Sequence, residues 1–170
     1  KYIDIAEKPE IAMKEMEEFN PEFVGTDTNM LRKLAILKNE GIGKNVNPEY
    51  LGSAGAMLDK YTRNYVEKAF GAQILDSYAS TEAGPIAFEC IKGGYYHVHS
   101  DFVYLEFLDE ENKPVDFGIP GNTVITKFYG TGTPIIRYTG ISDLVVPVEL
   151  ELECGITTQM IKQIEGRSTD

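Results

Sequence analysis

The chain has 170 residues, of which 42% are hydrophobic and 25% charged, as is usual for a water-soluble globular protein. With 16 basic and 27 acidic residues its net charge is -11, so its surface repels phosphate backbones and a nucleic-acid partner is not expected. No apolar run approaches the roughly 18 residues of a membrane span, and residues 1–10 lack a signal-peptide core. Two cysteines make a poor disulfide framework, which predicts a reduced, cytoplasmic setting. A homodimer remains an option.

The first half of the chain predicts helices and strands in alternation. Pro9 and apolar residues at helical spacing predict a helix over 9–19. Two further apolar stripes predict helices that end at Gly41 and Gly71. The strands between and after them are expected at 22–24, 50–51 and 74–78. This order predicts a parallel sheet with right-handed crossover connections.

After residue 85 the hydrophobic period changes from that of helices to that of strands. Strands are expected at 86–90, 95–99, 102–108 and 123–128, with turn signals between them. This half therefore predicts an antiparallel sheet or small barrel. We predict an α/β fold in which residues 1–85 form a parallel-sheet subdomain and residues 86–163 form a β-rich subdomain.

Three loops follow the carboxyl ends of the predicted parallel strands, where open α/β sheets bind ligands: 25–29, 52–55 and 79–84. The small residues of the second loop would let a ligand ring lie against the backbone, although a tight turn without a ligand is equally consistent. The third loop, with Tyr78 before it, offers an aromatic ring, hydroxyls and a carboxylate. Such a set can stack a base, bind a phosphate and hold Mg²⁺. A strand end followed by a helix-capping box would have the same residue pattern without binding a ligand.

The segment Tyr78-Ala-Ser-Thr-Glu82 closely resembles the aromatic-x-x-Thr-Glu motif of adenylate-forming enzymes. Two more segments follow in the order of that superfamily. Residues 134–143 resemble its Arg-Tyr…Thr-Gly-Asp segment, and residues 164–170 resemble its Gly-Arg-x-Asp-Asp hinge. The stretch 20–167 is most similar to the phenylacetate-CoA ligase branch, including Glu89-Cys90 and a Cys-Gly-x-Thr element at 154–157.

The resemblance implies an ATP-dependent, AMP-forming ligase that activates an aryl or other carboxylic acid as an acyl adenylate and transfers it to coenzyme A. Its small-molecule partners would be the acid and coenzyme A. Two alternatives stay open. One is a synthetase of the same superfamily that adenylylates a deazaflavin coenzyme without a CoA step, and the other is a non-catalytic nucleotide-binding or zinc-stabilised module.

The resemblance also implies roles for individual residues. Thr81 would bond the α-phosphate and Glu82 would ligate Mg²⁺, and these two are the expected catalytic groups. Asp143 would accept hydrogen bonds from the ribose hydroxyls, and Arg167 would contact the ribose or a phosphate from the hinge, residues 164–170. Tyr78 would stack on adenine. The other expected nucleotide-binding positions are Ser53, Ala54, Gly55, Asp76, Ser77, Ala79 and Ser80, with a structural role for Asp76 equally open.

Three departures from the superfamily pattern carry expectations of their own. Asp143 lies one residue further from Tyr138 than the superfamily spacing, which predicts a bulge or a register shift. Thr169 stands where the hinge carboxylate is expected, with Asp170 beside it. The Ser/Thr/Gly-rich phosphate loop and the lid lysine of these enzymes have no counterpart here, so we expect an internal fragment that is inactive alone. For Arg137 we favour pairing with a nearby carboxylate.

The histidines and cysteines suggest a zinc site. If Gly93-Gly94 forms a two-residue hairpin loop, Cys90 faces His97, and His99 lies on the same face. Cys154 stands where the phenylacetate-CoA ligase branch often carries a Cys-x-Cys-Gly pair, but the first cysteine of that pair is Leu152 here, so His99 would replace it. A structural Zn²⁺ held by Cys90, His97, His99 and Cys154 is one interpretation. A buried apolar cysteine with two solvated histidines is the other.

Overall fold

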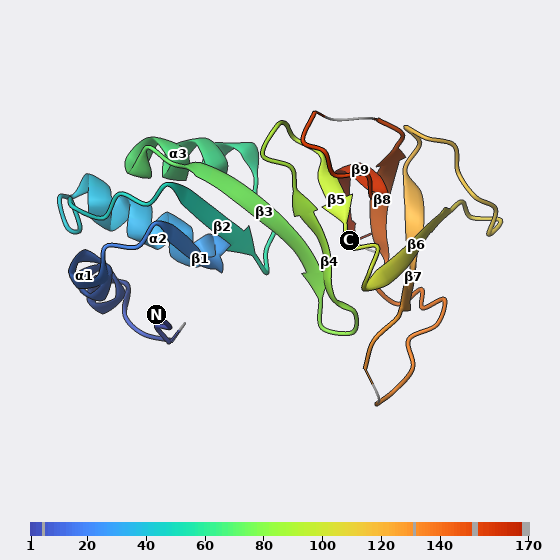
Figure 1. Ribbon diagram of the computed structural model, residues 1–170, viewed down its shortest axis with the longest axis horizontal. Helices are drawn as coiled ribbons and strands as arrows, with labels where there is room; N and C mark the ends of the chain where they lie inside the picture. Colours follow the sequence, from blue (N-terminus) through green and yellow to red (C-terminus); the bar gives the residue numbers. More distant parts are fainter. Residues whose placement is uncertain (5, 131, 151–152, 168–170) are drawn as a thin grey trace. The chain divides into compact units, whose positions relative to one another are not determined.

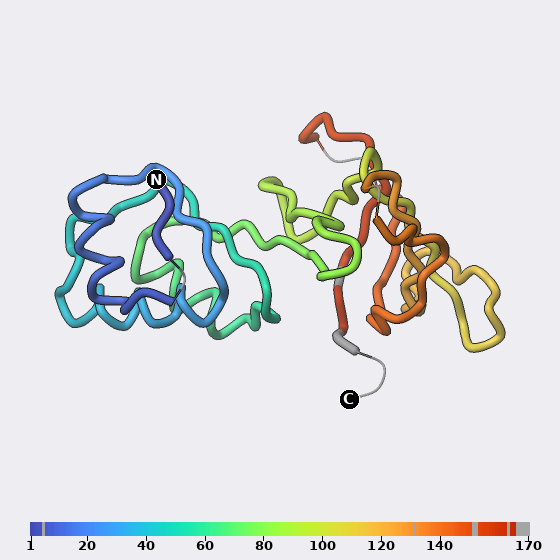
Figure 2. The backbone as a smooth tube through the Cα atoms, turned by 90° about the horizontal axis from the view of Figure 1, so that it is seen from below, coloured from blue at the N-terminus to red at the C-terminus, as the bar shows by residue number. Residues whose placement is uncertain are grey.

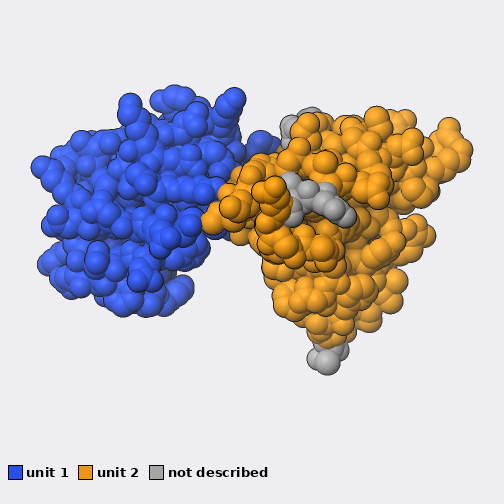
Figure 3. Space-filling view, turned by 45° about the horizontal axis from the view of Figure 1, so that its top comes forward, with its two compact units in different colours: residues 1–76 blue, residues 77–170 orange. Residues whose placement is uncertain are grey.

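The computed structural model describes residues 1–4, 6–130, 132–150 and 153–167. The chain divides into two compact units, unit 1 with residues 1–76 and unit 2 with residues 77–170 (Figure 3). The tube in Figure 2 shows that the chain completes unit 1 before it enters unit 2, so each unit is one continuous segment. No helix in these described ranges has the length and apolarity needed to cross a bilayer.

Unit 1 is a three-stranded parallel sheet with crossover helices. Its elements are α1 (Pro9–Phe19), β1 (Phe23–Asp27), α2 (Thr28–Asn39), β2 (Tyr50–Ala54), α3 (Lys60–Phe70) and the first part of β3 (Gln73–Ser80). The strand order is β1-β2-β3, so right-handed crossovers that step in one direction place α2 and α3 on the same face of the sheet. These helices pack against each other, and the core between helices and sheet includes Met13, Leu31, Leu51, Val66 and Ile74.

Both crossover helices of unit 1 begin at an aspartate cap. The Asp27 carboxylate accepts hydrogen bonds from the backbone N–H groups of Asn29 and Met30 at 2.9 and 3.1 Å. Asp59 caps α3 in the same way. Because Asp27 both ends β1 and caps α2, the loop expected at 25–29 is wrong: residues 25–27 belong to β1 and residues 28–29 to α2.

Strand β3 changes partners along its length. Residues 73–76 pair in parallel with β2, whereas residues 77–80 pair antiparallel with β4 (Gly84–Glu89). The sequence placed the change of architecture near residue 85, where the hydrophobic period changes. In the structure it falls inside β3, because a strand keeps its own period when the direction of its neighbour changes.

Unit 2 is an antiparallel sheet. After β4 come β5 (Tyr96–Val98), β6 (Val103–Leu108), β7 (Gly121–Lys127), β8 (Asp143–Val148) and β9 (Met160–Arg167), in the spatial order β3-β4-β5-β9-β8-β7-β6. The strands curl around one apolar interior (Figure 1), which includes Ile86, Val98, Leu105, Ile125 and Ile161. The predicted α/β fold, a parallel βαβαβ part followed by an antiparallel part, is confirmed.

Candidate functional site

The turn between β3 and β4 holds two of the predicted site residues at the surface. Thr81 and Glu82 are exposed, and their side chains project from a three-residue turn, 81–83. The Ser80 hydroxyl accepts a hydrogen bond from the backbone N–H of Ala83 at 3.0 Å, which closes the turn. Ala79 and Ser80 belong to β3 rather than to a loop. The turn therefore presents a hydroxyl and a carboxylate to solvent from a fixed backbone.

A second segment of unit 2 is hydrogen-bonded to the backbone of this turn. The Tyr129 hydroxyl donates to the Ala83 carbonyl at 2.9 Å, and Lys127 Nζ donates to the Glu82 carbonyl at 3.3 Å. The Lys127 ammonium also lies 4.5 Å from the centre of the Tyr129 ring. Sequence reasoning missed both residues, because contacts across more than 40 positions leave no local pattern.

Tyr78 and Asp143 are in direct contact. The Tyr78 hydroxyl donates to Asp143 Oδ2 at 2.6 Å, although the two residues are 65 positions apart. The Tyr78 side chain is only 8% exposed and belongs to the core of unit 2. Burial, together with the hydrogen bond to the Asp143 carboxylate, raises the pKa of Tyr78 well above its usual value. The hydrogen bond thus joins the 78–82 motif to the Asp143 carboxylate of the 134–143 segment.

Asp143 sits on an irregular strand start, as its shifted spacing predicted. Ser142 has a left-handed φ of 57°, and the β8–β9 register shifts between Asp143 and Val145. The left-handed turn lies within the lengthened Tyr138–Asp143 spacing, and the irregular register follows it. Asp143 pairs in backbone register with Arg167, so two residues expected at the ribose meet on neighbouring strands. The expected hinge positions 168–170 lie outside the described residues.

The predicted site residues of unit 1 differ in accessibility. Ser53 is 1% exposed and its hydroxyl is hydrogen-bonded to that of Thr28 at 2.9 Å, so Ser53 braces the end of β2. Ala54 is half-buried and Gly55 is exposed with a left-handed φ of 78°. Asp76, in β3, is half-buried and lies opposite Ser53 in the parallel register. Ser77 and Ala79, the next positions with side chains at the surface, belong to unit 2.

Arg137 has the structural role that the sequence favoured. Its guanidinium donates to both carboxylate oxygens of Glu106, from Nε at 3.0 Å and from Nη2 at 3.2 Å. The backbone of Arg137 is left-handed, with φ 46°, and its N–H donates to the Thr126 hydroxyl. Both the side chain and the backbone N–H of Arg137 are therefore hydrogen-bonded to strands of the unit 2 sheet.

A cavity of about 350 Å³ lies within unit 1, lined by the first residues of the chain, α1, β1 and the start of α2. Its lining is mostly apolar and includes Met16, Phe19 and Phe23. The site residues predicted from the sequence are not among those that line it.

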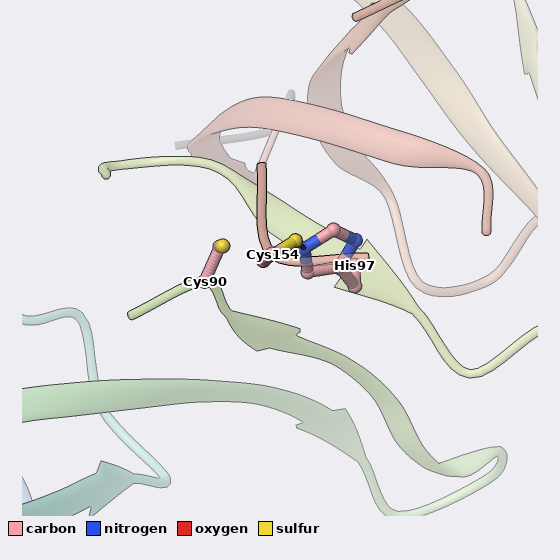
Figure 4. A group of neighbouring side chains, drawn as sticks. All are labelled: Cys90, His97 and Cys154. Carbon is pink, nitrogen blue, oxygen red and sulfur yellow. Dashed lines mark hydrogen bonds between the residues drawn. The ribbon is translucent and has the colours of Figure 1, made fainter. Parts of the chain in front are cut away.

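The cysteines and one histidine also come together, in unit 2. The ligand atoms of Cys90, His97 and Cys154 all lie within 4.8 Å of one another (Figure 4). Burial raises the pKa of the Cys90 thiol, and burial lowers the pKa of His97. The β4–β5 register pairs Phe88 with His97, two residues away from the prediction, because the hairpin loop is longer than Gly93-Gly94.

His99 does not join this group. Its ring packs between Phe88 and Phe102, with ring centroids 4.9 and 5.6 Å away. The register shift of two residues keeps Cys90 and His97 on one face of the hairpin but moves them to diagonal positions. The predicted position 152 lies outside the described residues.

Comparison with known proteins shows that the chain is similar in sequence to one protein and in fold to solved CoA ligases. No protein-family model matches the chain. The chain is 30% identical over 164 residues to protein CapK of Staphylococcus aureus, an alignment covering 93% of this chain and 34% of that protein. A structure of 2-hydroxyisobutyryl-CoA ligase in complex with 2-HIB-AMP and CoA matches 94% of this chain and 39% of its own, with TM-score 0.84 and 22% identity.

A benzoate CoA ligase from Burkholderia xenovorans matches 96% of this chain and 35% of its own, with TM-score 0.66 and 18% identity. The chain therefore has the fold found in these CoA ligases. It spans about a third of the length of the proteins that it matches.

Proposed function

We propose that this chain contributes part of the adenine-nucleotide site of an AMP-forming acid–CoA ligase of the adenylate-forming superfamily. The observation that carries the proposal is the hydrogen bond from Tyr78 to Asp143. It joins the aromatic-x-x-Thr-Glu motif to the carboxylate that the resemblance assigns to the ribose. The fold shared with CoA ligases supports the same conclusion.

The residues of the turn fit a metal-bound triphosphate. Glu82 is an exposed carboxylate on a turn whose backbone Tyr129 and Lys127 hold in place, and Thr81 offers a hydroxyl beside it. We assign Glu82 to Mg²⁺ and Thr81 to the α-phosphate. Mg²⁺ would supply positive charge at the phosphates of a protein whose net charge is -11.

Asp143 and Tyr78 act together in this proposal. The Asp143 carboxylate accepts hydrogen bonds from the ribose hydroxyls, and the buried Tyr78 hydroxyl fixes its orientation. The Tyr78 ring borders the adenine through its small exposed part. The resemblance assigns Arg167, opposite Asp143 in the β8–β9 backbone register, to the ribose or a phosphate. Ser53 positions Ala54 and Gly55 through its bond to Thr28.

The reaction proposed for the whole protein has two steps. A carboxylate oxygen of the acid attacks the α-phosphorus of ATP, pyrophosphate leaves, and an acyl adenylate forms. The thiol of coenzyme A then attacks the acyl carbon, AMP leaves, and the thioester forms. Because the phosphate loop and lysine that the resemblance implies are not among these 170 residues, we propose that the chain alone binds nucleotide without turnover.

Acid-dependent exchange of labelled pyrophosphate into ATP, measured with the protein that contains this chain, tests the proposal. The Glu82→Gln variant should lose exchange by on the order of 100-fold and should need more Mg²⁺. The matched control is Glu110→Gln, a neutralised exposed carboxylate elsewhere in unit 2, which should leave exchange unchanged. Exchange that is absent with every acid tested, or that persists in Glu82→Gln at limiting Mg²⁺, contradicts it.

A further inference from the structure

Three segments of unit 2 bring soft ligand atoms to one point. Cys90 directly follows β4, His97 lies in β5, and Cys154 lies in the connection between β8 and β9 (Figure 4). Cys154 Sγ is 3.3 Å from His97 Nε2, and the three ligand atoms lie within 4.8 Å of one another. The cysteines are 64 positions apart, yet both thiols are free.

The environment of His97 is unusual for a histidine with a packing role alone. The side chain is fully buried, and its Nδ1 has no hydrogen-bond partner among the described residues. A buried polar side chain normally finds strong hydrogen-bond partners, whereas the partner of Nε2 is the Cys154 thiol, a weak one. With the proton on Nδ1, the Nε2 lone pair faces the sulfur atoms. That lone pair is then available to a metal.

The chemistry of the donors selects the metal. Two thiolates and one imidazole form a borderline-soft set that suits Zn²⁺. Tetrahedral zinc with bonds of about 2.3 Å to sulfur and 2.0 Å to nitrogen separates its ligand atoms by roughly 3.5–3.8 Å. The Cys154 Sγ to His97 Nε2 distance is 3.3 Å and no separation exceeds 4.8 Å, so small side-chain rotations suffice to reach this geometry. Two thiolates also neutralise the charge of Zn²⁺, which makes the buried site electrically balanced.

We propose that Cys90, His97 and Cys154 bind one Zn²⁺ ion, with a fourth position open to solvent beside the half-buried Cys154. His99 is not a ligand, because its ring is packed between Phe88 and Phe102. The metal fastens the β8–β9 connection to the β4–β5 hairpin. It thereby anchors the start of β9, whose other end places Arg167 opposite Asp143.

The zinc proposal does not depend on the proposed ligase activity, and metal binding tests it directly. The 170-residue chain, purified reduced and without a histidine tag, should contain or take up about one equivalent of Zn²⁺. Co²⁺ in its place should give a thiolate-to-cobalt charge-transfer band. Cys90→Ser, His97→Gln and Cys154→Ser should each lower zinc affinity by at least about 100-fold in competition with a chelating dye.

The adjacent histidine provides the matched control. His99→Gln should keep full zinc affinity and the cobalt spectrum, because it leaves all three ligands in place. Circular dichroism identifies any variant that fails to fold. Cys154 is only half-buried, so the Cys154→Ser variant keeps the test valid if variants at the buried Cys90 and His97 unfold. Reduced wild-type chain that binds no zinc, Cys154→Ser that binds as wild type, or equal losses in His99→Gln and His97→Gln would overturn the proposal.

Discussion

The Tyr78 side chain joins two sequence motifs and should make the stability of the folded protein depend on pH. Its phenol is neutral in the folded protein, because burial and the Asp143 carboxylate oppose its ionisation. In the unfolded chain the phenol titrates with the ordinary tyrosine pKa of about 10. Below that pH both states hold the proton. Above it the unfolded state loses the proton first, so folded stability must fall as the pH rises.

The Tyr78→Phe variant isolates this effect. Above about pH 10, Tyr78 should lower the free energy of unfolding by up to roughly 1.4 kcal/mol per pH unit, and the variant should lack this slope. Denaturant unfolding of both proteins from about pH 9 to 11 measures the difference. Tyr104→Phe, at a side chain that is 55% exposed, should retain the wild-type slope. Parallel pH profiles for wild type and Tyr78→Phe would show that the phenol ionises freely in the folded protein.

Single residues were predictable where chemistry alone decides their partner. The pairing of Arg137 with a carboxylate is confirmed by its two bonds to Glu106, because a cation in a β-rich run needs an acidic neighbour. The nucleotide-binding role predicted for Ser53 did not take account of the hydrogen bond between its hydroxyl and that of Thr28. That contact joins residues 25 positions apart and leaves no trace in local sequence.

At the scale of elements, the β3–β4 turn is the part on which the proposed chemistry depends. Its backbone accepts hydrogen bonds from Lys127, the last residue of β7, and from Tyr129, two residues further on. Gly84 makes this arrangement fit. It has a left-handed φ of 76°, and a Cβ at this position would overlap the Tyr129 hydroxyl.

Gly84→Ala should therefore damage the turn twice, by strain at a left-handed position and by displacing Tyr129. We expect a loss of about 1–3 kcal/mol in unfolding free energy and weaker nucleotide binding. Gly132→Ala is the control, because a Cβ there meets nothing within 4 Å. It should change stability by no more than about 0.5 kcal/mol. Denaturant unfolding of the two variants compares them, and equal stabilities would mean that Tyr129 does not hold the turn.

The elements themselves were largely readable from periodicity. The predicted helix at 9–19 matches α1, and the β-rich segments of the second half match β4 to β7 to within a few residues. Strands β8 and β9 were not specified, because Pro147 and the polar residues after Met160 weaken the alternation. The hairpin register was off by two residues, because the glycine pair suggested a shorter loop than the one that forms.

At the scale of the whole molecule, the site residues predicted from the sequence are divided between the two units. Unit 2 holds the turn, Tyr78 and Asp143, together with the Cys90–His97–Cys154 group. Unit 1 holds the small-residue end of β2, braced by Ser53 and Thr28. The motif order in the sequence predicted a shared site for Tyr78 and Asp143, and the structure brings these two side chains into contact. It could not predict that Asp143 is oriented by Tyr78, because that contact exists only after the sheet of unit 2 has formed.

Calorimetric titration of the 170-residue chain with AMP and Mg²⁺ tests the central claim that Tyr78 to Glu82 and Asp143 form an adenine-nucleotide site. The chain should bind AMP saturably. Asp143→Ala removes charge-assisted bonds worth roughly 1.5–3 kcal/mol, so its affinity should fall by about 10- to 150-fold. Asp101→Ala, which removes an exposed carboxylate between β5 and β6, should bind as wild type. Absence of saturable binding by the wild-type chain, or equal affinity in a folded Asp143→Ala variant, would contradict the assignment of this site.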